Sequence, residues 1–343
     1  MRTIIRESFA WMDAHSGFDV LFNQPCFKSY TSIRVQDSAP LWLKLRSRLQ
    51  RDRSLESPFC SNRHHATARS SKTQSFDQVL LTVGENQYSS EWFHLQDKSK
   101  LFLFLHQPPG WWLRSWDKQV LNGVGGIICL SQQQCDFFKN LAPTLLIQHG
   151  VDLDFFKPAS DGRLAYNLLF VGGWLRDFRV LLNTIVHLSA KFPHVQLQCV
   201  IPKHFFTDPD VTRLMAHPNV TVLSGISGEK LRSLYQNANL LLCPLLDGTA
   251  NNGIVEALSC GLPVISTDVG GTHRYVNSTT GALCRPFDSA HFIQTTEEWL
   301  SNPERASAAG KACRKFAETN LKWETTATNI HAWINSITNT NAK

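Results

Sequence analysis

The chain has 343 residues, of which 43% are hydrophobic and 18% are charged, and its formal net charge is +6. This composition excludes a disordered or fibrous protein, and the length is sufficient for two domains that each have a core. The modest positive charge suits a ligand that carries phosphate. It is too small and too dispersed to indicate nucleic acid, and we expect no nucleic-acid partner.

Cysteine usage and hydrophobicity indicate the compartment. The nine cysteines are scattered singly without a CxxC pair, which is typical of reduced thiols in a cytoplasmic protein. No apolar run approaches the ~18 residues that span a bilayer, and the first residues, MRTIIRESFAWMD, lack a signal-peptide core. The basic segment 41–53 interleaves apolar residues with Lys and Arg. It is either a solvated helix or a peripheral contact with the inner face of an anionic membrane.

The first half of the chain shows a weak α/β pattern. The apolar runs RTIIRES, QVLLTVG, LFLFLHQ and GIICLS each end in a polar or glycine turn, as buried strands do. Residues 47–76 are rich in Ser and Arg without a clear period, which predicts a long insertion or loop. We place a first domain at 1–157, followed by a linker marked by Pro158, Ser160 and Gly162.

The second half alternates clearly between short apolar runs and helical patterns, which is the signature of βαβ units and a parallel sheet. Strands are predicted at 168–173, 196–202, 220–226, 240–245 and 263–267, and helices at 178–191, 227–237 and 251–261. This pattern predicts a second domain over residues 164–320. Residues 321–343 are predicted to form a helix that packs back on the first domain.

The segment DGTANNGIVEALSCGLPVISTDVGGTHRYV (247–276) holds the densest polar and glycine signal. Ligands of open parallel sheets bind beyond the carboxyl ends of the strands, where both the loop 249–253 and the turn 270–271 are expected. A helix N-terminus favours an anion, and paired glycines allow close backbone approach. The segment has neither a Walker lysine pattern nor GxGxxG. It therefore predicts a phosphate-and-ribose cradle of another kind.

The residues expected to bind a ligand in this cradle are Asn251, Asn252, Gly253, Glu256, Gly270, Gly271, Thr272 and Arg274. Glu256 lies about one turn inside its helix, where it can reach a hydroxylated ligand, and the alternative is a solvated helix glutamate. The two asparagines either bind a sugar or cap the helix. The paired glycines either approach a phosphate or form an ordinary turn.

The same segment is similar to the signature of the family 4 glycosyltransferases. In that family a Glu-x7-Glu motif precedes an ACGxPVIxSDVGG run; here Glu256 matches the second glutamate, and ALSCGLPVISTDVGG follows nearly residue for residue. Further matches are IICLSQQQCDFF, IQHGVDLDFFKP, LLFVGGW and LRSLYQNANLLLCPL. The resemblance covers residues 100–335 well and residues 1–99 only loosely.

The resemblance implies the GT-B fold, an α/β architecture of two facing Rossmann-like domains with parallel sheets and an interdomain cleft. It implies a nucleotide-diphosphate sugar as donor, with Glu256 on the ribose hydroxyls. Sugar transfer, of hexosyltransferase type, would reach a glycan, lipid-linked or small-molecule acceptor in polysaccharide or glycolipid biosynthesis. Retention of configuration and no metal or other cofactor are expected. Neither DLD (152–154) nor DPD (208–210) is expected to hold a metal ion.

The chain departs from the family's second-domain motifs at two places. The first motif glutamate falls at Gly248, so Asn251 or Asn252 is expected to supply the hydrogen bonds to the sugar hydroxyls. The family's basic pair in GRLxxxKG is replaced by GGWLRDFR. Arg176 or Arg179 is then expected to stabilise the departing diphosphate, together with Arg274 and the helix N-terminal amides.

The third departure is in the first domain, where His106 matches the family's sugar-side histidine only by position. It is either a general base or a structural histidine at a strand end. Two other functions remain open. An epimerase of the same fold would need catalytic carboxylates from both domains, and the first domain shows no clear acidic cluster. A non-catalytic sugar-binding protein derived from a transferase would account for the missing glutamate, and binding without turnover would identify it.

Overall fold

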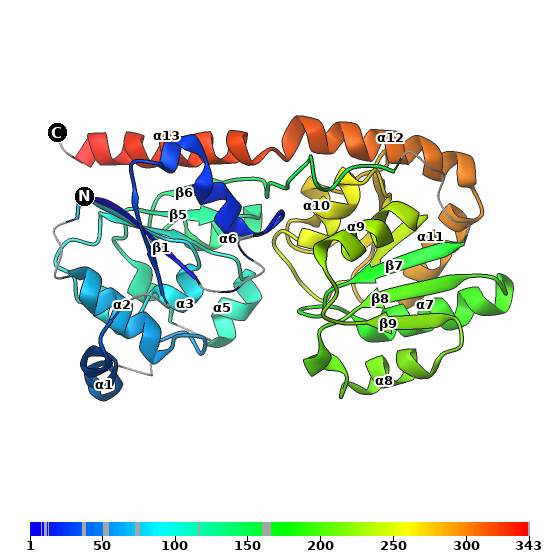
Figure 1. Ribbon diagram of the computed structural model, residues 1–343, viewed down its shortest axis with the longest axis horizontal. Coiled ribbons are helices and arrows are strands. Elements are labelled where there is room, and N and C mark those ends of the chain that lie inside the picture. Colours follow the sequence, from blue (N-terminus) through cyan, green and yellow to red (C-terminus); the bar gives the residue numbers. More distant parts are fainter. Residues whose placement is uncertain are drawn as a thin grey trace. The chain divides into compact units, whose positions relative to one another are not determined.

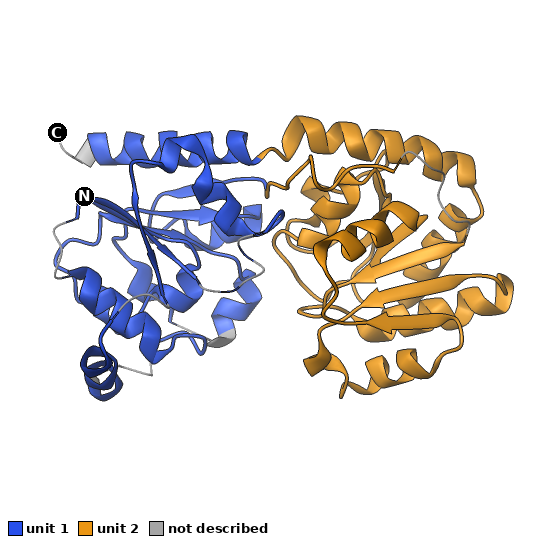
Figure 2. Cartoon of the chain, viewed as in Figure 1, with its two compact units in different colours: residues 1–148, 323–343 blue, residues 149–322 orange. Residues whose placement is uncertain are grey.

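The computed structural model describes residues 1–343 except 8, 10–11, 13, 36–38, 51–54, 73–75, 116, 160–165 and 342–343. The chain divides into two compact units, which are coloured separately in Figure 2. Unit 1 comprises residues 1–148 and 323–343, and unit 2 comprises residues 149–322. Each unit has a six-stranded sheet in its described part.

The sheet of unit 1 has the order β2-β1-β3-β4-β5-β6, and all its pairings are parallel. Its strands are β1 (Arg2–Arg6), β2 (Thr31–Arg34), β3 (Gln78–Leu81), β4 (Leu101–Phe104), β5 (Gly126–Cys129) and β6 (Thr144–Leu146). Every residue of β3, β4 and β5 is buried. Continuous apolar runs are what a parallel sheet covered on both faces requires, and the predicted strands are confirmed.

The helices of unit 1 are α1 (Leu41–Gln50), α2 (Asn62–Lys72), α3 (Gly84–Gln87), α4 (Ser90–Phe93), α5 (Pro109–Ser115), α6 (Gln132–Phe138) and α13 (Trp323–Asn341) (Figure 1). The prediction of a loop over 47–76 is wrong where α2 and the end of α1 form. The buried residues of α2 are mostly polar, and His64 Nε2 lies 2.9 Å from Glu7 Oε1. A helix that buries polar side chains on polar partners shows no apolar period. Residues 51–54 and 73–75 of the predicted loop lie outside the described residues.

Helix α13 belongs to unit 1. Its Trp323 Nε1 donates to His15 O at 2.9 Å, and Thr326 Oγ1 donates to Gln148 O at 3.1 Å. The segment 149–157, which the sequence analysis assigned to the first domain, belongs to unit 2. Val151 N donates to Leu321 O at 2.9 Å, and both residues share one buried apolar cluster.

The sheet of unit 2 has the order β12-β11-β10-β7-β8-β9, again with parallel pairings only. Its strands are β7 (Asn167–Val171), β8 (Gln196–Val200), β9 (Val220–Leu223), β10 (Leu240–Cys243), β11 (Val264–Thr267) and β12 (Gly281–Cys284). Its helices are α7 (Phe178–Lys191), α8 (Pro209–Ala216), α9 (Gly228–Asn237), α10 (Asn252–Ser259), α11 (Ser289–Leu300) and α12 (Pro303–Asn320).

Successive residues of the central strands of unit 2 enter different cores. Leu169 and Leu241 belong to one buried cluster, whereas Leu168 and Leu240 belong to another. Because side chains alternate between the faces of a strand, the two clusters lie on opposite faces of the sheet. Both faces are therefore covered, and ligands can approach only at the ends of the strands.

The helices of unit 2 begin at polar caps. Asp177 Oδ1 accepts from Val180 N at 3.0 Å and Ser227 Oγ accepts from Lys230 N at 3.3 Å. The predicted helix start at Ser227 is thus confirmed, and each cap satisfies backbone donors that a helix leaves open. Within the described residues, no helix is both long enough and apolar enough to cross a membrane.

Candidate functional site

The loop after β7 is organised by Arg176. Its guanidinium donates to Val171 O at 3.1 and 3.2 Å, to Trp174 O at 3.0 Å and to Asn251 Oδ1 at 3.2 Å. Gly172 has φ +106°, and a Cβ there would lie 2.6 Å from Arg176 Nη2. The glycine therefore makes room for the guanidinium. One cation is fixed at the carboxyl end of β7, next to the N-terminus of α10.

The loops after β10 and β11 approach each other at two glycines. Gly270 has φ +54°, and a Cβ at this position would lie 1.5 Å from Gly248 O. Leu245 N donates to Thr267 Oγ1 at 3.0 Å and ties the same two loops together. Side chains other than hydrogen do not fit at Gly270, so the backbones of the two loops lie in direct contact there.

The residues after Gly270 form the short 3₁₀ helix η6 (Thr272–Arg274), for which Gly271 is the N-cap. Thr272 Oγ1 lies 3.0 and 2.8 Å from Thr267 O and Val269 O and can donate to either carbonyl, and it accepts from Val269 N at 3.1 Å. With these bonds Thr272 holds the turn in shape. Arg274 is half-buried on the same 3₁₀ helix.

Helix α10 begins at Asn251, whose Oδ1 accepts from Ile254 N at 3.4 Å as well as from Arg176. Its neighbour Asn252 is half-buried and Gly253 is buried. A Cβ on Gly253 would lie 3.2 Å from Asn251 Oδ1 and 3.4 Å from Tyr235 Oη. The capping interpretation of Asn251 is therefore confirmed, and its side chain also links α10 to the loop after β7.

Glu256 is 5% exposed, and its Oε2 accepts from Tyr235 Oη at 2.7 Å. Burial, reinforced by the Glu256 carboxylate, raises the pKa of Tyr235 well above its ordinary value, so the phenol stays a donor. The alternative of a solvated glutamate is wrong, because the side chain is buried. Glu256 is instead a buried carboxylate held on one side by Tyr235.

The structure separates the two candidate arginines. Arg176 joins the loops, whereas the side chain of Arg179 is 78% exposed on the first turn of α7 and lies 3.7 Å from Asp210 Oδ2. The predicted residues thus fall into two contact groups. In the first, Arg176 contacts Asn251; in the second, Gly270 contacts the loop after β10. Tyr235 and the role of Gly248 were missed, because a tyrosine inside a helix and a lone loop glycine carry no sequence signal of their contacts.

In unit 1, His106 follows β4 at the carboxyl edge of the sheet. Its ring packs against Phe18 and Phe104, at centroid distances of 4.3 and 4.4 Å, and its Nε2 is 2.8 Å from Thr82 O. A carbonyl can only accept, so Nε2 carries the proton. Burial lowers the pKa of His106 to about 4, which makes the neutral imidazole a weak base at pH 7.

Glu85, on α3, was missed by the sequence analysis and lies beside His106. It is 1% exposed, and its Oε1 accepts from His106 N and from Gln107 N, the latter at 2.6 Å. Gln134 Nε2 donates to Leu105 O and Gln107 O at 3.1 and 2.9 Å. The loop after β4 is therefore held from both sides by buried polar groups, and a glutamate in a four-residue helix gives no pattern that sequence reasoning could use.

The buried Glu85 carboxyl makes the stability of unit 1 depend on pH. Burial raises its pKa to about 7 from an ordinary value of 4.5. The folded chain therefore binds the proton more tightly; the stability from this group is fully present below pH 4.5 and is lost as the pH rises through 7. A shift of this size corresponds to about 3 kcal/mol as an upper bound.

Glu85→Gln should remove this dependence, because the amide oxygen can accept the same bonds without a charge. Between pH 5 and pH 8 the variant should gain up to about 3 kcal/mol of unfolding free energy relative to the unsubstituted chain. Urea unfolding at both pH values measures this difference, with Asp136→Asn, an exposed carboxylate on α6, as the control. Parallel pH profiles for Glu85→Gln and the original chain would contradict the assignment.

The two Asp-x-Asp sequences have structural roles. Asp152 Oδ1 accepts from Asp154 N and Phe155 N at 3.1 and 2.9 Å. Asp208 caps α8, and Asp210 Oδ1 lies 3.2 Å from Arg213 Nη1. Each first carboxylate closes a turn or caps a helix, which accounts for both sequences without a metal ion.

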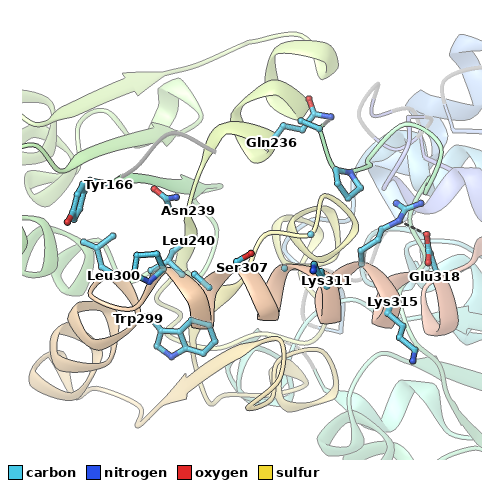
Figure 3. Close-up of a pocket in the computed structure, with 17 residues that line it drawn as sticks. Tyr166, Gln236, Asn239, Leu240, Trp299, Leu300, Ser307, Lys311, Lys315 and Glu318 are labelled. Carbon is cyan, nitrogen blue, oxygen red and sulfur yellow. Dashed lines mark hydrogen bonds and ion pairs between the residues drawn. The ribbon is translucent and has the colours of Figure 1, made fainter. Parts of the chain in front are cut away.

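A cavity of about 850 Å³ lies at the opposite edge of the unit 2 sheet (Figure 3). Tyr166 and Asn239, which immediately precede β7 and β10, line it together with Ser307 and Lys311 of α12. These are the amino ends of the strands. Parallel sheets bind ligands at the carboxyl ends, so this cavity is distinct from the loops around Arg176 and Gly270.

Comparison with known proteins shows which family the second half of the chain resembles. Residues 165–302 match the family described as glycosyl transferases group 1. A D-inositol 3-phosphate glycosyltransferase from Arthrobacter sp. is 26% identical over 196 residues, which cover 52% of this chain and 46% of that protein. Spore coat protein SA from Bacillus subtilis is 22% identical over 216 residues, which cover 54% of this chain and 57% of that protein. The chain thus matches about half the length of these relatives.

Solved structures share the fold over nearly the whole chain. Sucrose-phosphate synthase from Thermosynechococcus elongatus has a TM-score of 0.74 at 18% identity, with 98% of this chain and 99% of that chain covered. Anabaena HepE in complex with UDP and glucose has a TM-score of 0.72 at 14% identity, with 98% and 100% covered. The two parallel α/β units confirm the predicted GT-B class. Residues 165–302 of the chain are similar to the glycosyl transferases group 1 family.

Proposed function

We propose that the protein transfers a sugar from a nucleotide-diphosphate sugar to an acceptor, and that unit 2 binds the donor at the loops after β7, β10 and β11. The observation that carries this proposal is the direct contact of Arg176 with Asn251 at the N-terminus of α10. It supplies a fixed cation and a helix N-terminus in one place, and both stabilise a diphosphate. The family match over residues 165–302 supports the reaction class.

The described contacts suggest a role for each residue. Arg176 takes the diphosphate charge, assisted by Arg274, and the turn at Gly270 and Gly271, which has no side chains, lets the phosphates approach the backbone. Thr272 and Gly253 shape these loops, and Asn252 offers its amide to a sugar hydroxyl. Glu256 accepts from the ribose hydroxyls in addition to its bond from Tyr235. In unit 1, His106 acts as a neutral hydrogen-bonding group on the acceptor side.

Several finer features belong to the same proposal. The transfer proceeds with retention and without a metal ion, because Arg176 and backbone amides replace the cation that would otherwise neutralise the leaving group. The acceptor is a glycan or a lipid-linked sugar, and the protein works in the cytoplasm. Helix α1 carries Leu41, Trp42, Leu45 and Leu49 exposed beside basic residues, which supports peripheral binding to an anionic membrane. Residues 51–53 of the basic segment lie outside the described residues.

A donor screen tests the proposal. Purified protein is incubated with UDP-, GDP- and ADP-sugars, and binding and slow release of nucleotide are measured. One donor should bind and hydrolyse slowly, and Glu256→Gln should weaken its binding by about tenfold or more, as expected for loss of a charged hydrogen bond. Tyr235→Phe is the matched control, because it removes only the partner of Glu256.

The outcomes distinguish the functions. If Glu256 acts only through Tyr235, both variants will lose affinity equally, and the ribose role is contradicted. Binding of a donor without any turnover, even with acceptors present, would identify a non-catalytic sugar-binding protein. Conversion of the sugar to its epimer would identify an epimerase, and failure to bind any donor would contradict the proposal as a whole.

A further inference from the structure

A group of metal-ligand side chains lies in unit 1, in the segment where the sequence analysis expected an unstructured insertion. Glu56 and Cys60 precede α2, and His65 lies on its first turns. One ligand atom from each of these three residues lies within 4.8 Å of the others. Glu56 and His65 are 7% and 0% exposed, and Cys60 is half-buried. Among the described residues this group combines three different ligand types in one enclosed place.

The chemistry of the group selects the kind of metal. A thiolate, an imidazole and a carboxylate are the three side-chain ligands of Zn²⁺, which favours tetrahedral sites at 2.0–2.3 Å from each ligand atom. Hard cations such as Mg²⁺ and Ca²⁺ prefer oxygen ligands only and do not suit a sulfur atom. Three protein ligands leave a fourth position for a water molecule or another small ligand. A divalent zinc ion therefore fits this ligand set better than Mg²⁺ or Ca²⁺.

The contacts around the group place its ligands in the way that metal sites require. Glu56 Oε1 and Oε2 lie 2.8 and 2.9 Å from His65 Nε2, and Ser90 N donates to Glu56 Oε1 at 3.1 Å. This backbone bond fixes the carboxylate from outside the group. His65 Nδ1 is buried, and within the described residues it makes no hydrogen bond. Nε2 is the nitrogen that faces Glu56, so the proposal rests on the gathered ligand atoms and on the bond from Ser90, and not on Nδ1.

The group also joins three elements. Glu56 comes from the loop before α2, His65 from α2 itself, and Ser90 from the first turn of α4. Arg69 of α2 forms an ion pair with Glu91 of α4. A metal ion bound here would close the segment 56–65 on itself and hold it against α4. The buried surface of α2 is polar, so a bound ion would supply the stability that apolar packing supplies elsewhere.

We propose that Glu56, Cys60 and His65 bind a Zn²⁺ ion that fastens α2 and the preceding loop to unit 1. The site is separate from the proposed sugar transfer, which needs no metal ion, and it does not depend on that proposal. Binding would release the proton of the Cys60 thiol, because zinc coordinates the thiolate. The expectation that the chain holds no metal is thereby revised for a structural ion only.

The experiment measures zinc in the full chain. Protein purified without chelator should contain stoichiometric Zn²⁺ by elemental analysis, and zinc added back to chelator-treated protein should raise its unfolding temperature in a concentration-dependent way. Cys60→Ser should lower zinc affinity by at least about tenfold. Cys26→Ser is the matched control, because Cys26 is also a half-buried thiol and lies outside the group. His64→Gln controls for the neighbouring histidine, which pairs with Glu7.

A second measurement detects the thiolate ligand directly, first in the original chain and then in the two cysteine variants. Co²⁺ added to the metal-depleted original chain should produce a thiolate-to-cobalt charge-transfer band, which Cys26→Ser retains and Cys60→Ser loses. The proposal is overturned if the original chain binds neither ion, or if Cys60→Ser and Cys26→Ser retain the same zinc affinity. Donor binding is measured on the same samples, and its loss without loss of zinc would count against the proposed sugar transfer alone.

Discussion

Arg176→Ala is expected to lower the rate of sugar transfer, or of slow donor hydrolysis, by about 10²–10³-fold. The guanidinium is fixed by four hydrogen bonds to Val171, Trp174 and Asn251. A cation held in advance at the leaving diphosphate costs no reorganisation during the reaction, and losing one such group typically costs about 3–4 kcal/mol. Steady-state kinetics with the donor found in the screen measures the effect.

The matched control for this prediction is Arg179→Ala. Arg179 is 78% exposed and lies on the surface of α7, so its loss should leave the rate within about twofold, as for most surface substitutions. Arg176→Ala could lower affinity by removing a positive charge or by changing the shape of the loop. Comparing the affinities of the variant for the nucleoside diphosphate and for the uncharged nucleoside separates these two effects. Arg176→Ala should weaken the first far more than the second. Equal losses for both ligands would show that Arg176 only shapes the loop.

Gly270→Ala is expected to destabilise unit 2 by more than about 3 kcal/mol and to abolish measurable donor binding. The added methyl group would lie 1.5 Å from the carbonyl oxygen of Gly248. Backbone, unlike a flexible side chain, cannot turn away, so the loops after β10 and β11 must move apart. Urea unfolding measures the first effect and donor titration the second.

Gly225→Ala isolates the part of this effect that comes from backbone conformation. Gly225 also has a positive φ, +64°, but a Cβ there meets nothing within 4 Å. Its substitution should cost only about 1–2 kcal/mol, the ordinary penalty of a left-handed residue. If both glycine variants are equally stable, the close approach of the two loops does not matter for folding.

Much of the fold was predictable because its strands are continuous apolar runs. β4 (LFLF) and β10 (LLLC) are wholly buried, and such runs separated by helical patterns indicate a parallel sheet without further information. The helix start at Ser227 was predictable because an N-cap is a local interaction. It requires only the side chain of the capping residue and a backbone N–H in the first turn of the helix.

Helix α2 was not predictable by the same rules. Its buried His64 and His65 depend on Glu7 and Glu56, which lie 57 and 9 residues away in the sequence. Polar burial is specified by partners from other elements, and no periodicity within the helix reveals them. The same holds for Glu85, whose importance comes from accepting the N–H groups of a loop that follows a different strand.

The candidate site shows the same division between local and distant information. The glycines and asparagines of 247–276 were identified because their types suit a ligand loop. The choice between Arg176 and Arg179 needed the position of Asn251, 75 residues further along the chain. Residue types therefore indicated the region, and long-range contacts are the basis of the roles that we propose within it.

Unit 1 is built from two separate stretches of the chain, residues 1–148 and 323–343, whereas unit 2 is one uninterrupted stretch. During synthesis on the ribosome, the polypeptide of unit 2 is complete while unit 1 still lacks α13. The side chains of α13 reach their partners only after translation has passed residue 322. One example is Trp323, which donates a hydrogen bond to His15 O. Until then, the part of residues 1–148 that α13 contacts stays uncovered. Synthesis of unit 1 therefore begins before that of unit 2 but ends after it.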